Sequence, residues 1–400
     1  MAMEKCWRWF GPGDPVTLSD MRQMGVEGVV TSLYDVPPGQ VWPREQIKAV
    51  KTSIEQAGLR WSVVESLPVA EGIKQHTESY DELVDVYTQS LRHLGEQGID
   101  TVCYNFMPAL DWVRTDLHHR LPSGGEVMYF NPVKFAAFDL FILQRPAAEA
   151  DYSEETIQQA ESLYNKMHVS EREELAYNII ILTQGFIHGA IDSGEQYYRE
   201  KFLELLTKYD EIDRARLRRH LGSFLNDVIP TAEQAGINLA IHPDDPPFPV
   251  LGLPRIVSTQ DDLQWIFKQQ TSLANGLTFC SGSLSVRRDN DPAAIAAAFA
   301  ERIHFVHLRN NRVLKNGAFY ESGHIQGDAD LPQLIELILQ EQHRRREQGR
   351  TDTRMPVRPD HGIKMLSDFN ENTAPGYPRI GRLSGLMEIR GMEAALEYCF

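Results

Sequence analysis

Four side chains of types that commonly bind metal ions occur in the second half of the chain, each near the end of a short apolar run. They are His242, Cys280, His307 and Asp360, and tens of residues separate each from the next. A closed structural zinc site would instead use short C-x₂-C spacings. A thiolate with two imidazoles argues against magnesium and calcium, and it fits zinc, iron(II) or manganese(II). The pattern predicts an open metal site that receives one ligand from each of four structural units.

Each of these residues, taken alone, also has an ordinary structural explanation. A histidine in a strand is often a hydrogen-bonded core residue, and a buried cysteine often acts as a small hydrophobe. Independent core residues have no reason to gather at one end of successive strands, so their joint position favours the metal site. Alternation then separates His304 from His307, because residues three apart in a strand face opposite sides. His307 shares its face with Arg309, and we expect His304 to pack outward against a helix.

Two further residues are candidates for proton transfer. His361 follows Asp360 directly and is predicted to be a general acid or base, with orientation of the Asp360 carboxylate as the alternative. For both side chains to face the site the chain must already be turning, and Gly362 is expected to permit that turn. Tyr377 lies in the sequence Pro375-Gly-Tyr-Pro-Arg379. It is interpreted as a proton donor or a substrate contact, and otherwise as a packing residue.

Two residues are candidates for substrate binding. Arg309 is positioned to bind a carboxylate with two parallel hydrogen bonds, and the alternative is a salt bridge to an acid of a covering segment. Asn105 ends an earlier apolar run and could hydrogen-bond a sugar hydroxyl. Asp244 and Asp245 follow His242 and are expected to shape its loop or support its ligands.

The elements that must position these residues repeat a short apolar run, a polar turn and a helical pattern. Eight such runs predict a single (β/α)₈ TIM barrel over residues 1–400, and barrel enzymes build their sites at the carboxyl ends of the strands. A doubly wound open sheet would need a glycine-rich phosphate turn, for which Gly11-Pro-Gly13 is a weak candidate. The predicted strands are 6–10, 28–33, 60–66, 101–106, 237–242, 277–280, 303–308 and 356–360. After the fourth strand the repeat is interrupted, and residues 107–234 are predicted to form a large helical insertion that acts as a lid.

Composition limits the possible partners. The chain of 400 residues has a formal net charge of −16, which argues against nucleic acid and anionic membranes as partners. An anionic substrate would therefore need local positive charge at its binding site.

No apolar stretch is long enough for a membrane helix, and the start lacks the apolar segment of a signal peptide, so a cytoplasmic location is expected. Four cysteines are too few for a disulfide framework. A homodimer is expected only from the frequency of such assemblies.

Several segments, spread over nearly the whole chain, together resemble the mannonate dehydratase family. They are Trp7-Arg-Trp9, Val102-Cys-Tyr-Asn-Phe-Met-Pro108, Asp111-Trp-Val-Arg-Thr-Asp116, His242-Pro-Asp-Asp-Pro-Pro247, Leu251-Gly-Leu-Pro-Arg-Ile-Val-Ser258, His307-Leu-Arg309 and Arg358-Pro-Asp-His-Gly362. The resemblance implies a barrel related to metal-dependent sugar isomerases. It implies removal of water from D-mannonate to give 2-dehydro-3-deoxy-D-gluconate in hexuronate (glucuronate) catabolism, with Fe(II) or Mn(II).

The resemblance also implies roles for particular residues. The family's metal ligands match His242, Cys280, His307 and Asp360, and its acid/base pair matches His361 and Tyr377. Two alternatives to a dehydratase remain at this point. A metal-dependent sugar isomerase or epimerase on the same barrel would move a proton without losing water, and a non-catalytic sugar-acid binder would form no product.

Overall fold

The predicted barrel is confirmed by a computed structural model, which describes residues 3–184, 194 and 196–397. Cys399 lies outside the described residues. Within them, eight parallel strands close into a barrel in the order β1-β12-β9-β8-β7-β4-β3-β2. These strands are β1 (Glu4–Arg8), β2 (Gly28–Thr31), β3 (Arg60–Glu65), β4 (Thr101–Tyr104), β7 (Asn238–Ile241), β8 (Asn275–Cys280), β9 (Ile303–His307) and β12 (Pro356–Arg358).

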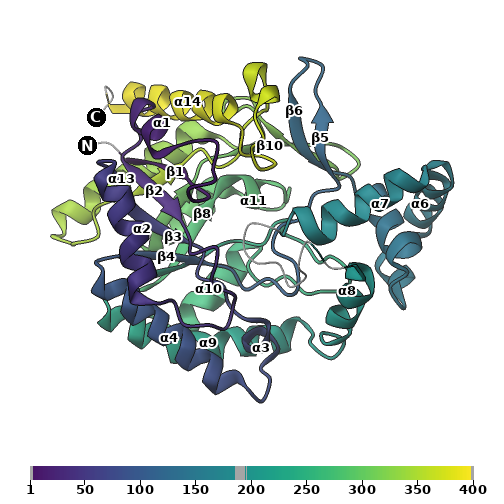
Figure 1. Ribbon diagram of the computed structural model, residues 1–400, viewed down its shortest axis with the longest axis horizontal. Helices are drawn as coiled ribbons and strands as arrows, with labels where there is room; N and C mark the ends of the chain where they lie inside the picture. Colours follow the sequence, from purple (N-terminus) through teal and green to yellow (C-terminus); the bar gives the residue numbers. More distant parts are fainter. Residues whose placement is uncertain (1–2, 185–193, 195, 398–400) are drawn as a thin grey trace.

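Helices surround the barrel and separate consecutive strands (Figure 1). Several begin at side-chain caps of the expected type, such as Thr17 before α1 and Thr259 before α10, which bind otherwise unpaired backbone N–H groups. Among the described residues, none of the helices combines the length and apolar character needed to cross a bilayer. The helices are α1 (Leu18–Gln23), α2 (Arg44–Gln56), α3 (Glu71–Gln75), α4 (Tyr80–Glu96), α9 (Arg214–Gln234), α10 (Gln260–Gln269), α11 (Ser281–Ser285), α12 (Pro292–Phe299), α13 (Leu331–Glu347) and α14 (Arg379–Glu397), with a 3₁₀ turn at Ala300–Arg302.

An apolar layer inside the barrel supports the residues above it. The layer consists of one buried side chain from each of five strands, namely Cys6, Val30, Val63, Cys103 and Phe305. Side chains two positions apart in a strand share a face, so the next inward residues lie one level closer to the carboxyl ends. On β1, β3 and β9 these are charged or titratable, and all three are buried: Arg8, Glu65 and His307. The strand alternation therefore places a polar layer directly above an apolar one.

A second, four-stranded antiparallel sheet lies beside the barrel and was not predicted. Its order is β10-β11-β6-β5, so it joins a hairpin after β4 to a hairpin after β9. The signals were present, because an Asn316-Gly317 turn and a Gly124-Gly125 turn each separate two short strands. The strands are β5 (Asp116–Arg120), β6 (Glu126–Phe130), β10 (Asn310–Val313) and β11 (Phe319–Ser322).

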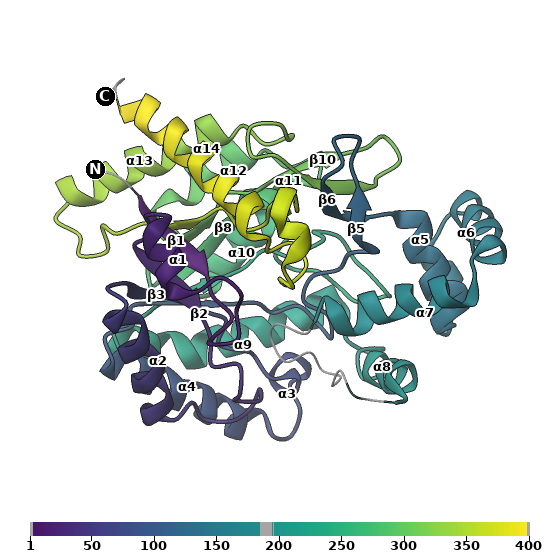
Figure 2. The ribbon, with the colours of Figure 1, turned by 45° about the horizontal axis from the view of Figure 1, so that its top comes forward.

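Short helices after β6 form a lobe that projects away from α2, α4 and α13 (Figure 2). They are α5 (Pro132–Ala137), a π-helix (Phe138–Leu143), a 3₁₀ turn (Ala148–Asp151), α6 (Glu154–Lys166), α7 (Val169–Tyr177), a second π-helix (Asn178–Leu182) and α8 (Tyr198–Thr207). Residues 107–234 thus contain two strands as well as helices. They also contain α9, which packs against α4 and leads into β7 as a helix of the barrel itself. The function of this segment as a lid stays a prediction.

The loop after β12 packs closely against α14, and this contact gives Gly362 a role other than the expected one. A Cβ atom on Gly362 would lie 2.5 Å from the backbone nitrogen of Arg382 and 2.5 Å from the backbone carbon of Gly381. Gly362 is not among the residues with positive φ, whereas Asp360 has a φ of 62°. The expectation that Gly362 provides the turn was therefore wrong, because the chain turns two residues earlier.

Gly362→Ala is expected to destabilise the protein by about 1–3 kcal/mol, since the added methyl group meets backbone that no rotamer change can move away. Gly391→Ala in α14 is the matched control, because nothing lies within 4 Å of its Cβ position. Urea unfolding should show a lower midpoint for Gly362→Ala and an unchanged or higher one for Gly391→Ala. Equal midpoints for Gly362→Ala and the parent chain would contradict the packing argument.

Candidate active site

Three of the four predicted metal ligands come together at the carboxyl ends of consecutive barrel strands. His242 follows β7, Cys280 ends β8 and His307 ends β9. One ligand atom from each of the three lies within 4.8 Å of the others. The distance between His242 Nε2 and His307 Nδ1 is 3.2 Å. These atoms therefore point at a common centre.

Asp360 lies beside this cluster, two residues beyond the end of β12. Its Oδ2 atom is 4.0 Å from Cys280 Sγ and 3.8 Å from His307 Nδ1. The left-handed backbone conformation costs about 1–2 kcal/mol for most residues, and Asp is among those that adopt it most readily. This conformation explains how Asp360 and His361 both face the pocket although they are neighbours in the chain. Arg358 and Arg309 form ion pairs with the carboxylate and hold it in place.

The electrostatics of the cluster favour an anionic sulfur. Burial alone would raise the pKa of Cys280, but Arg309 and the two histidines lower it well below its usual value. Burial likewise opposes protonation of His242, and the Cys280 thiolate overcomes this and raises the pKa of His242 to about 9. The thiolate, the carboxylate and the two imidazoles are all groups that bind metal ions. Nitrogen, sulfur and oxygen donors around one centre fit a divalent transition-metal ion.

The two candidate proton-transfer residues lie together on one side of the pocket. The rings of His361 and Tyr377 are 5.1 Å apart and meet edge to face at 83°. His361 Nδ1 lies 2.8 Å from Arg309 Nη1 and 3.2 Å from Glu321 Oε1. Phe10 packs edge to face against Tyr377 with ring centroids 4.9 Å apart. Burial, only partly offset by Arg358, raises the pKa of Tyr377 to about 12, so its hydroxyl keeps its proton at neutral pH.

Arg309 is engaged by protein acids rather than left free for a substrate. Its Nη1 donates to Glu321 Oε1 over 3.1 Å, and its Nη2 donates to Asp245. Arg114 pairs with the same two acids, at 2.7 Å to Asp245 and 2.9 Å to Glu321. Two arginines and two carboxylates thus form a buried cluster that joins the barrel to β11. A substrate carboxylate could form two parallel bonds to Arg309 only by displacing one of these acids.

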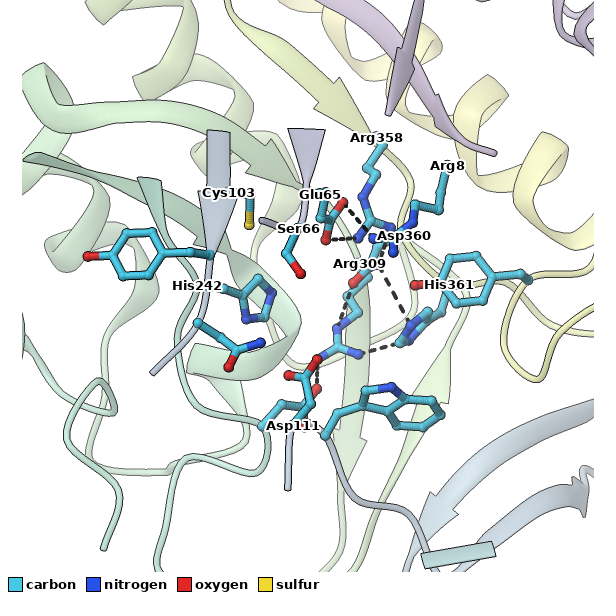
Figure 3. A pocket seen from close by; sticks show the side chains of 15 residues that line it. Arg8, Glu65, Ser66, Cys103, Asp111, His242, Arg309, Arg358, Asp360 and His361 are labelled. Atoms are coloured by element: carbon cyan, nitrogen blue, oxygen red, sulfur yellow. Dashed lines mark hydrogen bonds and ion pairs between the residues drawn. The ribbon is translucent and has the colours of Figure 1, made fainter. Parts of the chain in front are cut away.

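A pocket opens beside these groups, and its residues include several to which the sequence alone gave no role (Figure 3). Asn105 lines it, and its bond to a sugar hydroxyl stays a prediction. Alternation could have identified Arg8 and Glu65, because each lies two residues beyond an apolar inward position on its strand. The lining residues are Arg8, Glu65, Ser66, Cys103, Tyr104, Asn105, Asp111, Trp112, His242, Asp245, Arg309, Arg358, Asp360, His361 and Tyr377.

The prediction that His304, unlike His307, faces away from the pocket is confirmed. His304 Nε2 binds the backbone oxygen of Leu273 over 2.8 Å, and its Nδ1 lies 3.7 Å from Asp352. It therefore faces away from the pocket, as the alternation along β9 requires.

The chain is similar to proteins of one enzyme family. The D-mannonate dehydratase (UxuA) family model matches residues 3–400. Two relatives described as mannonate dehydratase, from Marinomonas sp. and Chromohalobacter salexigens, are 47% and 48% identical over 396 residues, which cover 99% of this chain and 99% of each relative.

Solved structures agree with this similarity. A mannonate dehydratase from Streptococcus suis serotype 2 has a TM-score of 0.76 at 32% identity, covering 99% of this chain and 94% of that chain. A D-tagatose 3-epimerase-like protein has a TM-score of 0.50 at 11% identity, covering 99% of each chain, and this likeness shows the shared fold alone. The matches therefore favour the dehydratase over the sugar isomerase alternative. The chain belongs to the D-mannonate dehydratase family of hydro-lyases.

Proposed function

We propose that the dehydration of D-mannonate takes place in the pocket at the barrel mouth, with Fe(II) or Mn(II) bound there. The proposed ligands are His242, Cys280, His307 and Asp360. The observation that carries the proposal is the convergence of three donor atoms within 4.8 Å, with a carboxylate and two proton-transfer candidates beside them. A buried thiolate with imidazole and carboxylate neighbours is a donor set for a transition metal rather than for magnesium.

The reaction requires charge stabilisation and two proton transfers. Loss of the C2 proton of an aldonate puts further negative charge on a carboxylate that is already anionic. A bound divalent metal supplies Lewis-acid stabilisation of that charge. The chain's own residues must remove the C2 proton and protonate the hydroxyl that leaves from C3, each step typically contributing about 10²–10⁴-fold.

We assign these two tasks to His361 and Tyr377. The base form requires the proton on Nδ1, donated to Glu321 rather than replaced by a bond from Arg309, and Nε2 then has the lone pair that accepts the C2 proton. Tyr377 keeps its proton at neutral pH and donates it to the C3 oxygen as the C–O bond breaks and water leaves. The product enol then tautomerises to the 2-keto-3-deoxy acid. Asn105 is proposed to hydrogen-bond a substrate hydroxyl, and Arg309 to supply positive charge to the pocket wall.

The proposed lid is supported by its contact with the pocket wall. Gln184, two residues after the second π-helix of the lobe, accepts a hydrogen bond from the Asp111 backbone over 2.7 Å and donates to the Trp112 carbonyl over 2.8 Å. Asp111 and Trp112 both line the pocket. The predicted lid, residues 107–234, therefore contributes two residues to the pocket wall, and Gln184 binds their backbone. A homodimer is also proposed, from the frequency of such assemblies.

Incubation with D-mannonate tests the proposed function. The chelated chain should be inactive, and Fe(II) or Mn(II) should restore formation of a 2-keto-3-deoxy acid, detected by a colorimetric assay. An epimer of mannonate as the only product would instead identify an epimerase. A metal-loaded chain that is stabilised by mannonate but forms no product would identify a binding protein.

Tyr377→Phe is expected to lower kcat by about 10²–10⁴-fold, because the variant keeps the ring that packs on Phe10 but loses the proton donor. Metal content and the unfolding midpoint should stay close to those of the parent chain. Kinetics with D-mannonate, together with elemental analysis, measure both quantities. A kcat within a factor of two or three of the parent value would remove Tyr377 from the mechanism.

A further inference from the structure

The two histidines of the cluster present different ring nitrogens to it. Nδ1 of His242 lies 2.7 Å from the backbone oxygen of Pro243. A carbonyl oxygen can only accept, so this nitrogen keeps its proton in the neutral ring, and Nε2 is the atom that can offer a lone pair to a metal. That Nε2 is the atom 3.2 Å from Nδ1 of His307. The backbone of His242's own loop thus fixes Nε2 as its ligand atom.

His307 is turned the other way. Its Nδ1 faces His242 Nε2 at 3.2 Å and Asp360 Oδ2 at 3.8 Å. Its Nε2 is buried and has no hydrogen-bond partner among the described residues, while Glu65 Oε1 lies 3.5 Å away. A neutral imidazole has one N–H donor and one acceptor. An ion held at the cluster would need the lone pair of Nδ1, so the proton would then lie on Nε2, where the Glu65 carboxylate can accept it.

Glu65 is held in a fixed place by two arginines. Arg358 Nη2 donates to Glu65 Oε1 over 2.8 Å, and Arg8 Nη1 lies 3.2 Å from Glu65 Oε2. Arg358 also forms an ion pair with Asp360, so one guanidinium connects Glu65 with a proposed ligand. Each carboxylate oxygen can accept two hydrogen bonds. Glu65 Oε1 therefore has room for the Nε2–H of His307 beside its bond from Arg358.

We propose that Glu65 is a positioning residue for the metal site. Its carboxylate accepts the Nε2–H of His307 and so directs the Nδ1 of His307 at the ion. The contact of 3.5 Å is long for an N–H···O bond. A cation on Nδ1 would make Nε2–H a stronger donor, which favours a shorter contact in the loaded site. The two imidazole ligands then bind through unlike atoms, Nε2 of His242 and Nδ1 of His307. This inference rests on the proposed metal site and adds the residue that orients one of its ligands.

The metal affinity of the Glu65→Gln variant, compared with that of the parent chain, tests whether Glu65 orients His307. Losing the outer partner of a metal-bound histidine typically weakens binding by about 10–100-fold, so the Kd for Mn(II), measured by electron paramagnetic resonance of the free ion, should rise by that factor. The absorption bands of the Co(II)-loaded variant should shift, because the imidazole is reoriented and less basic. Glu341→Gln is the matched control, since Glu341 is also a buried carboxylate paired with arginines but lies on α13. It should leave both readouts unchanged.

A crystal structure of the unmodified chain loaded with Mn(II) tests the same role, even if Glu65→Gln does not fold. It should show Nδ1 of His307 and Nε2 of His242 against the ion. Coordination by His307 Nε2 would overturn the inference, as would a folded Glu65→Gln variant with the Kd and Co(II) spectrum of the parent chain. Failure of the unmodified chain to bind Mn(II) at these residues would instead contradict the proposed metal site itself.

Discussion

His361→Asn should abolish dehydration of D-mannonate while the metal stays bound. The expected loss in kcat is at least about 10²–10⁴-fold, the usual contribution of a positioned acid or base. Asparagine is similar in size and keeps a polar group beside Arg309 and Glu321, but it cannot take up a proton near neutral pH. Steady-state kinetics measure the loss, and elemental analysis of the dialysed variant measures the bound metal.

The control for this variant is His304, a buried histidine on β9, the strand that pairs with β12. His304→Asn removes the bond to Leu273 and is expected to lower the unfolding midpoint, yet its kcat should stay near that of the parent chain because His304 faces away from the pocket. Near-normal turnover in His361→Asn would refute its role in proton transfer. Loss of both turnover and metal would show that His361 mainly orients Asp360.

Cys280→Ser should lose both metal and turnover. Arg309 and the histidines keep Cys280 as a thiolate, and a serine hydroxyl in the same place would stay protonated and bind a divalent ion poorly. Because a direct ligand is removed, the Kd for Mn(II) should rise by more than the about 10–100-fold expected for an outer partner. Equilibrium dialysis followed by elemental analysis gives the affinity of the variant.

Cys6→Ser provides the comparison for Cys280→Ser. Cys6 is also a buried barrel cysteine, but it lies in the apolar layer below the pocket. Its replacement should change the unfolding midpoint without changing metal affinity. If Cys280→Ser bound Mn(II) as tightly as Cys6→Ser, the sulfur would not be a ligand.

Much of the barrel and the position of the cluster could be predicted because two simple regularities act together. Alternation along a strand determines which side chains face inward, and a parallel barrel brings all carboxyl ends to one rim. His242, Cys280 and His307 were identified in this way, and the structure brings them together. The same regularities apply to Glu65, which was overlooked because a lone acid in a β-branched run suggests no chemistry until its arginine partners are known.

The features that were missed depend on contacts between distant parts of the chain. The sheet formed by β5, β6, β10 and β11 joins two hairpins about two hundred residues apart, a pairing that local propensity does not encode. The partners of Arg309 could not be foreseen for the same reason, since Glu321 reaches it from that sheet. The turn at Asp360 was placed at Gly362 because glycine is the usual residue for positive φ. Gly362 is needed instead for its close contact with α14.

X-ray absorption of the Mn(II)- or Fe(II)-loaded chain shows whether Cys280 and the two histidines bind one ion. We expect one sulfur and two imidazole nitrogens among the atoms bound to a single ion per chain, and loss of the sulfur contribution in Cys280→Ser. A metal surrounded by oxygen and nitrogen alone in the unmodified chain would contradict this expectation.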